Sequence, residues 1–195
     1  MTIFTNYARI LPSLTLAACF LAGTGVALAE GSDDHTHDMD AMHQWAYPEL
    51  GAPGVAEEVS RTITITMYDN YFEPEELVIA AGETIRFVVI NEGQLVHEFN
   101  VASEEMHLRH QDEMMMMMDH GVLGADHINE DMMSMTMANG ETMHHNHPNS
   151  VLLEPGDTAE VIWTFNGDAE LEFACNVPGH YDAGMMGEIE IGSGS

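Results

Sequence analysis

The sequence predicts an all-β fold, either a β-sandwich or a Greek-key barrel, with a long Met- and His-rich insertion. Segments of alternating apolar and polar residues, rich in Val, Ile and Thr, occur in two blocks of the chain. Pro, Gly and Asn residues separate these segments, as expected for short turns. Neither block contains a convincing amphipathic helix, so strands are the predicted elements of the core.

Six or more short strands account for the two blocks. In the first block we expect strands at TITITMY (62–68), ELVIA (76–80) and ETIRFVVIN (83–91), with breaks at Asn70, Pro74 and Ala81-Gly82. In the second block we expect them within SVLLEPGDTAEVIWTFN (150–166), AELEFAC (169–175) and GEIEI (187–191), with turns at Pro155-Gly156 and Asn166-Gly167. Turn residues of these types allow neighbouring strands to be connected by only a few residues.

Residues 1–29 are predicted to be a secretory signal peptide, which would make the mature protein periplasmic. Arg9 precedes a largely apolar run that closes on Ala27-Leu28-Ala29, as in a charged region, an apolar region and a small-residue cleavage site. A retained membrane helix is the alternative, but Pro12, Gly23 and Gly25 interrupt the run. Leu16-Ala17-Ala18-Cys19 also resembles a lipobox, so a lipid anchor at Cys19 is a second alternative. After cleavage we expect no membrane span.

The net charge and the cysteine content of the chain argue against nucleic-acid binding and against a disulfide-stabilised fold. All 33 acidic residues follow residue 29, together with only three of the four arginines. So acidic a protein repels nucleic acid and attracts cations. Of the two cysteines, only Cys175 would remain after cleavage, which excludes a disulfide within the chain.

Residues 30–60 are predicted to be an acidic, largely disordered leader. The stretch 30–44 has no aliphatic side chain larger than Met, so it cannot build a core. Its soft and borderline ligands could wrap a copper ion, although incidental histidines in a flexible segment explain them equally well. These candidate ligands are His35, His37, Met39, Met42 and His43.

The insertion, residues 103–149, interrupts a domain that spans 61–192. It contains 11 of the 17 methionines and 7 of the 12 histidines but few bulky aliphatic residues. The methionines could pack as a helix face on the sandwich, but their mixture with histidines and acids favours a copper-binding loop, since thioethers select Cu(I). The candidate accessory ligands are Met106, Met114, Met115, Met116, Met117, Met118, Met132, Met133, Met135, Met137, Met143, His144, His145 and His147.

The stretch FACNVPGHYDAGM (173–185) predicts the main metal site. Cys175, His180 and Met185 follow one another at five-residue steps and could converge from one loop between two strands. His97 is the other histidine within the strand blocks. Two histidines, a thiolate and a weak axial thioether form the ligand set of electron-transfer copper. A buried structural cysteine, a Cys-His hydrolase and a zinc site are weaker alternatives, because zinc sites lack thioethers and no orienting partner for a nucleophile is evident.

These residues resemble the cupredoxins, the family of plastocyanin and azurin. The resemblance covers 61–102 and 150–192 and is densest in CNVPGH (175–180) and GMMG (184–187). It implies a β-sandwich with His97, Cys175, His180 and Met185 as type 1 copper ligands, and it disfavours Met186 as the axial ligand. The chain departs from many members at Glu98, where they carry Asn, so the colour of the site does not follow from the family.

Three functions are compatible with a single cupredoxin-type copper site. An oxidase or nitrite reductase is disfavoured because Ala174 and Asn176 flank Cys175, where those enzymes carry a histidine that leads to a second copper. A soluble electron carrier has no need of so many additional ligands. The leader and the insertion instead resemble the bacterial CopI-type periplasmic copper-tolerance proteins. That resemblance implies a non-enzymatic protein that binds copper, and allows for Cu(I) oxidation, with copper ions and a periplasmic redox or copper-handling protein as partners.

Overall fold

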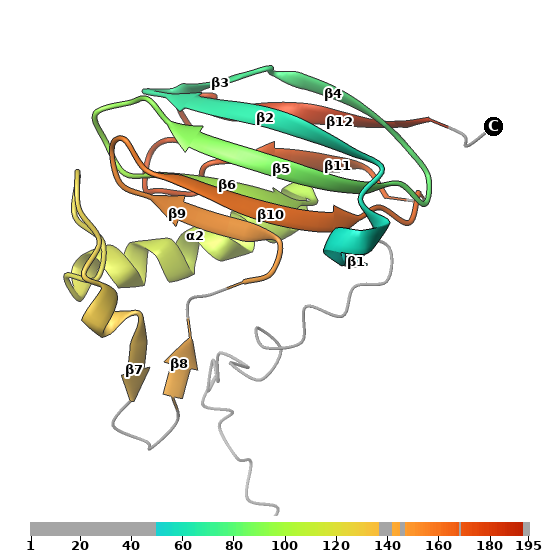
Figure 1. Ribbon diagram of the computed structural model, residues 1–195. Coiled ribbons are helices and arrows are strands. Elements are labelled where there is room, and N and C mark those ends of the chain that lie inside the picture. Colours follow the sequence, from blue (N-terminus) through green and yellow to red (C-terminus); the bar gives the residue numbers. More distant parts are fainter. Residues whose placement is uncertain (1–49, 137–141, 145–146, 168, 193–195) are drawn as a thin grey trace, which may run out of the picture. The chain divides into compact units, whose positions relative to one another are not determined.

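The computed structural model describes residues 50–136, 142–144, 147–167 and 169–192, which form two stacked β-sheets, one long helix and a small hairpin (Figure 1). The first sheet has the order β1-β10-β5-β2-β3, the second β4-β12-β11-β6-β9, and β7 pairs with β8. The all-β sandwich is therefore confirmed. Within the described ranges, no helix is both long and apolar enough to cross a membrane.

The strands of the first sheet are β1 (Ala52–Pro53), β2 (Arg61–Tyr68), β3 (Tyr71–Glu73), β5 (Thr84–Asn91) and β10 (Thr158–Thr164). Those of the second are β4 (Glu76–Ala80), β6 (His97–Ala102), β9 (Ser150–Leu153), β11 (Leu171–Ala174) and β12 (Met186–Gly192). The remaining elements are η1 (Ala56–Glu58), α2 (Glu104–Asp119), η2 (Glu130–Met132), β7 (Ser134–Thr136) and β8 (Thr142–His144).

The chain crosses between the sheets, which gives the Greek-key arrangement. It leaves the first sheet after β3, enters the second at β4, and returns for β5. Because of these crossings β2 pairs with β5 and β4 with β12 in parallel, while the other strand pairs are antiparallel. The ends of β6 and β11, which are adjacent in the second sheet, thereby come together from opposite halves of the sequence.

The core lies between the sheets and follows the period of two. In β5, Ile85, Phe87 and Val89 are fully buried, as the alternation of a half-covered strand requires. Phe87 packs on Phe99 of β6 with ring centroids 5.1 Å apart, so it joins the two sheets. Burial of such aromatic side chains contributes about 25 cal/mol for each Å² of apolar surface removed from water.

The sandwich begins before Arg61, the boundary that the sequence predicted. β1 pairs with β10, and the carbonyl oxygen of Leu50 accepts a hydrogen bond of 2.8 Å from the Trp163 indole. Residues 50–60 have no alternating pattern of their own, so only their partners in the fold could identify them. Residue contacts divide the chain into two units, 1–39 and 40–195, and all described residues belong to the second unit. The predicted signal peptide and the predicted leader ligands His35, His37, Met39, Met42 and His43 lie outside the described residues.

The start of the insertion is a 16-residue helix, α2, where a ligand-bearing loop was expected. Its buried side chains form one stripe: Met106, His107, His110, Glu113, Met114 and Met117. The helix lies against the face of the second sheet that points away from the first (Figure 1). The expectation of a loop was wrong because two histidines and a glutamate occupy positions in the buried stripe, which hides the helical period of the apolar residues.

The Met run therefore divides between two environments. Met114 and Met117 are buried in the core, as is Met106, whereas Met115 and Met118 are 49% and 37% exposed. The alternative prediction, that the methionines pack as a helix face on the sandwich, is therefore correct for Met106, Met114 and Met117. Further along, Met132 and Met133 pack partly buried against the core. Met135 and Met143 occupy paired positions of the β7–β8 hairpin, opposite each other, while Met137 and His145 lie outside the described residues.

We expect Met114→Ala to lower the free energy of unfolding by about 2 to 5 kcal/mol, because it leaves a cavity in a close-packed core. The matched change Met115→Ala, one residue further along the same helix, should cost less than about 0.5 kcal/mol because that side chain is exposed. Urea unfolding followed by circular dichroism measures both. Equal losses for the two variants would contradict the division of the Met run.

Candidate metal centre

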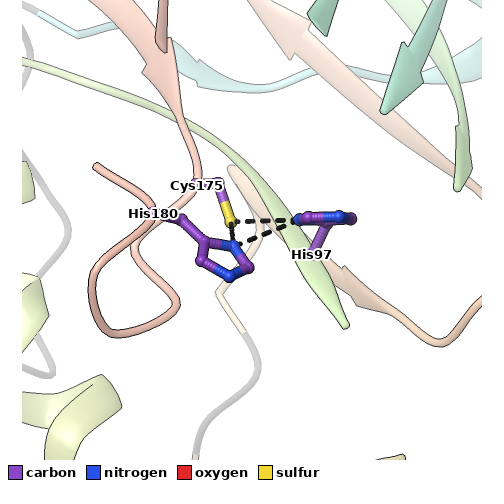
Figure 2. A group of neighbouring side chains, drawn as sticks. All are labelled: His97, Cys175 and His180. Carbon is purple, nitrogen blue, oxygen red and sulfur yellow. Dashed lines mark hydrogen bonds between the residues drawn. The ribbon is translucent and has the colours of Figure 1, made fainter. Parts of the chain in front are cut away.

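Three of the four predicted ligands converge at one end of the sandwich. His97 is the first residue of β6, and Cys175 directly follows β11. The antiparallel pairing of these strands places both residues at the same end of the second sheet. The loop that returns to β12 carries His180. Figure 2 shows the Cys175 sulfur and the two imidazole rings directed toward one point.

The loop from Cys175 to Met185 is held by its own backbone hydrogen bonds. The Met185 carbonyl accepts from the Cys175 N–H at 3.1 Å, and the Met185 N–H donates to the His180 carbonyl at 3.0 Å. Gly179 and Gly184 adopt φ angles of 88° and 91°, which favour glycine, and so permit the two tight turns. Met185 is fully buried and bonded through its backbone to both ligand-bearing residues, whereas Met186 belongs to β12.

The three side chains form a triangle of the size that a metal ion requires. The two Nδ1 atoms of His97 and His180 are 3.2 Å apart, and the Cys175 Sγ lies 3.8 Å from the first and 3.3 Å from the second. First-row metal bonds of about 2.0 Å to nitrogen and 2.3 Å to sulfur, in a trigonal plane, separate the nitrogens by about 3.5 Å and each from sulfur by about 3.7 Å. The donor set and its dimensions therefore fit one first-row ion with little movement.

Asp69 orients the His97 ring. Its Oδ1 lies 3.0 Å from His97 Nε2, so the hydrogen bond places the ring proton on Nε2 and leaves the Nδ1 lone pair for a metal. The Gln94 N–H donates to the same oxygen at 2.9 Å. A Cβ at residue 93 would lie 2.5 Å from that oxygen and 2.8 Å from His97 Nε2, so glycine is required there.

Burial keeps all three ligands neutral until an ion binds. Burial lowers the pKa of His97, although Asp69 opposes this effect, and burial and then the charge of His97 lower the pKa of His180. Burial raises the pKa of the Cys175 thiol to about 12. Both imidazoles are thus unprotonated at neutral pH, and the thiol releases its proton only when a cation replaces it.

Glu98 connects the centre to α2. Its backbone N–H donates to the Cys175 Sγ at 3.3 Å, and its side-chain carboxylate is fully buried. The carboxylate accepts from the Asn176 side chain at 2.8 Å and lies 3.0 Å from His110 Nε2. Burial opposes ionisation of Glu98, but the charge and hydrogen bond of His110 outweigh it, so the Glu98 pKa is lowered. Glu98 thus stabilises the loop that carries Cys175.

Sequence reasoning missed Asp69 and the partners of Glu98. Asp69 is 28 residues from His97, and nothing in its own segment distinguishes it from other turn acids. His107 of α2 lies 3.0 Å from the Asn176 side chain and stacks on Tyr181, which no spacing indicates. One sequence signal could have indicated these partners: His110 and Glu113 are three residues apart, a spacing that places both side chains on one face of a helix.

Comparisons with known proteins agree with this fold and with copper binding. The family described as Cupredoxin-like domain matches residues 42–123. The chain is 46% identical over 148 residues to the copper-resistant cuproprotein CopI of Pseudomonas aeruginosa, covering 73% of this chain and 82% of that protein. It is 32% identical over 190 residues to the protein of the same name from Rubrivivax gelatinosus, covering 94% and 98%. Auracyanin B superposes with a TM-score of 0.52 at 17% identity, covering 73% of this chain and 96% of that one, which shows the shared fold.

We expect Asp69→Asn to weaken Cu(II) binding about 10- to 100-fold, because the substitution removes the carboxylate that fixes the His97 ring. Asp182→Asn is the matched control, since it removes the same charge from an exposed position of the ligand loop. Competition with a chromophoric chelator measures both affinities. The prediction fails if the two variants lose affinity equally, because the effect would then be one of overall charge.

Proposed function

This chain belongs to the CopI family of cupredoxin-like proteins, and from that premise we propose that it is a periplasmic type 1 copper protein that binds copper for copper tolerance. The observation that carries the proposal is the buried triangle of two imidazole nitrogens and one thiol, with sides of 3.2 to 3.8 Å. Imidazole and thiolate together suit copper in both oxidation states. Two relatives that match most of this chain are named for copper resistance.

Each residue has a distinct part in this proposal. His97, His180 and Cys175 would hold the ion in a plane, and Met185 would supply the weak axial thioether. Asp69 holds the His97 ring in position, and the Glu98 N–H donates to the sulfur. Bound copper would supply reversible one-electron chemistry at a site whose ligands move little. Oxidation of a further Cu(I) ion would need an electron acceptor, which we assign by class to a periplasmic redox partner.

We expect Cys175→Ser to abolish the intense thiolate-to-copper colour of the Cu(II) protein and to reduce copper tolerance in a bacterium that lacks its own copy. The measurements are the visible absorption of the purified protein and growth on graded copper. Asp182→Asn, in the same loop, serves as the control with both properties retained. Loss of colour with unchanged tolerance would favour the soluble electron carrier, and retained colour would overturn the ligand assignment.

The methionines outside the core are proposed to collect additional Cu(I). Deleting 103–149 cannot test this, because α2 contributes Met106, Met114 and Met117 to the core. The alternative is a variant in which the other methionines of the insertion become Leu, which keeps side-chain volume and removes sulfur. The substituted residues are Met115, Met116, Met118, Met132, Met133, Met135, Met137 and Met143.

We expect the intact protein to bind more than one Cu(I) and the Leu variant to lose the additional ions, because thioethers are soft ligands that select Cu(I). The additional ions should survive Cys175→Ser and mildly acidic buffer, since thioethers do not titrate. Chelator competition measures the stoichiometry, and the type 1 colour of the Leu variant confirms its fold. A stoichiometry of one ion for both proteins would remove the case for an accessory role.

A further inference from the structure

A second group of ligand-type side chains lies between α2 and the second sheet. His110 and Glu113 come from α2, and His147 comes from the segment before β9. Their side chains are only 3%, 4% and 6% exposed. One ligand atom of each lies within 4.8 Å of the other two. None of the three is among the four ligands proposed for type 1 copper.

Glu113 presents one carboxylate oxygen to each imidazole. Its Oε2 is 3.0 Å from His110 Nδ1, and its Oε1 is 3.4 Å from His147 Nε2. First-row metal bonds of about 2.0 to 2.1 Å separate tetrahedral ligand atoms by about 3.3 Å. The three ligand atoms lie within 4.8 Å of one another, so side-chain shifts of about 1 Å would direct both imidazole nitrogens and one oxygen at a shared ion.

A histidine that binds a metal through one ring nitrogen usually donates the N–H of the other to a carboxylate, and His110 Nε2 already contacts the Glu98 carboxylate. His110 Nε2 lies 3.0 Å from Glu98 Oε1 and His110 Nδ1 lies 3.0 Å from Glu113 Oε2, so each ring nitrogen faces a carboxylate oxygen. Because an ionised carboxylate only accepts hydrogen bonds, this geometry favours a proton on each His110 nitrogen when no metal is bound. A cation in place of the Nδ1 proton would leave Nε2–H bonded to Glu98, the carboxylate–histidine–metal arrangement.

The charge of the cluster also favours a divalent ion. Two buried carboxylates, Glu98 and Glu113, flank His110, whose imidazolium compensates only one of two negative charges when both are ionised. A divalent cation that displaces the proton from His110 leaves the group neutral. Buried charges are costly unless they are paired, so this exchange is favourable.

An open cavity gives access to the group. It has a volume of about 420 Å³, and His147 forms part of its wall together with Glu130, Met133 and Ser150. Its wall thus carries a thioether and a carboxylate from the segment that follows α2. An ion captured by the insertion could reach His147 from this side without passing Cys175.

We propose that His110, Glu113 and His147 form a second metal centre, which takes Cu(II). The choice of metal follows from the ligands, because imidazole and carboxylate favour Cu(II) over other divalent first-row ions in the general order of affinity. Glu98 links this centre to the first one, since its carboxylate contacts His110 and its N–H contacts the Cys175 sulfur. The protein would then hold copper at two inner sites of different ligand chemistry.

The test is a titration of the mature protein with Cu(II) alone, followed by absorption and electron paramagnetic resonance. After the type 1 colour is saturated, we expect one further tightly bound, colourless Cu(II) with nitrogen ligands. Glu113→Gln and His147→Gln should each weaken it at least about 100-fold, more than a change outside the ligand shell would. Asp112→Asn and His120→Gln, exposed on and beside the same helix, should leave it unchanged.

Two control readouts separate loss of the site from loss of the fold. The type 1 colour and the thermal unfolding temperature should be similar in all four variants. Glu113 and His147 lie on different segments, so if one of the two variants misfolds, the other still tests the proposed metal centre. Equal Cu(II) stoichiometry and an unchanged spectrum in Glu113→Gln and His147→Gln would overturn the proposal, because the cluster would then be a structural hydrogen-bonded bridge. Preference for Zn(II) over Cu(II) in competition would overturn the assignment of the metal.

Discussion

Coverage of β6 on both faces is the constraint on which the rest of the structure depends. All six of its residues are buried, because Phe99 and Val101 face the core between the sheets while Glu98 and Asn100 face α2. Polar groups can be buried at such positions only if hydrogen bonds satisfy them. Asn176, His110 and Asn149 supply those bonds, and they tie the helix and the ligand loop to one strand.

The helix is therefore part of the metal centre's support as well as a cover for the sheet. Three of its methionines, Met106, Met114 and Met117, are buried in the core. Its histidines bond to Glu98 and Asn176, which are the chain neighbours of His97 and Cys175. In a low-dielectric interior such hydrogen bonds are stronger than in water, so they hold the helix and the ligand loop in a fixed relation to β6. The position of the Cys175 sulfur consequently depends on residues of the insertion that do not contact a metal there.

The strands, and the convergence of His97, Cys175 and His180, could be predicted from the sequence because most of their signals are local. Alternation marks each strand, and Cys175, His180 and Met185 lie within one loop. Asp69 and the members of the Glu98 network could not, since partners 28 and 12 residues apart meet only in the folded chain. The helix was considered but disfavoured for a related reason, because the polar network requires histidine and glutamate at positions that an ordinary amphipathic helix fills with leucine.

Charge balance explains why the centre can be both buried and ready to bind. Without an ion, the imidazoles of His97 and His180 and the Cys175 thiol are neutral, so no buried charge at these ligands opposes folding. If a divalent ion binds at the proposed ligands, the Cys175 thiolate would compensate one charge, and Asp69, hydrogen-bonded to His97, would compensate the other. With a monovalent ion the thiolate alone is sufficient. Asp69 is 39% exposed, so water stabilises its carboxylate in either case. The proposed copper centre would therefore accept both oxidation states without a change in its buried groups.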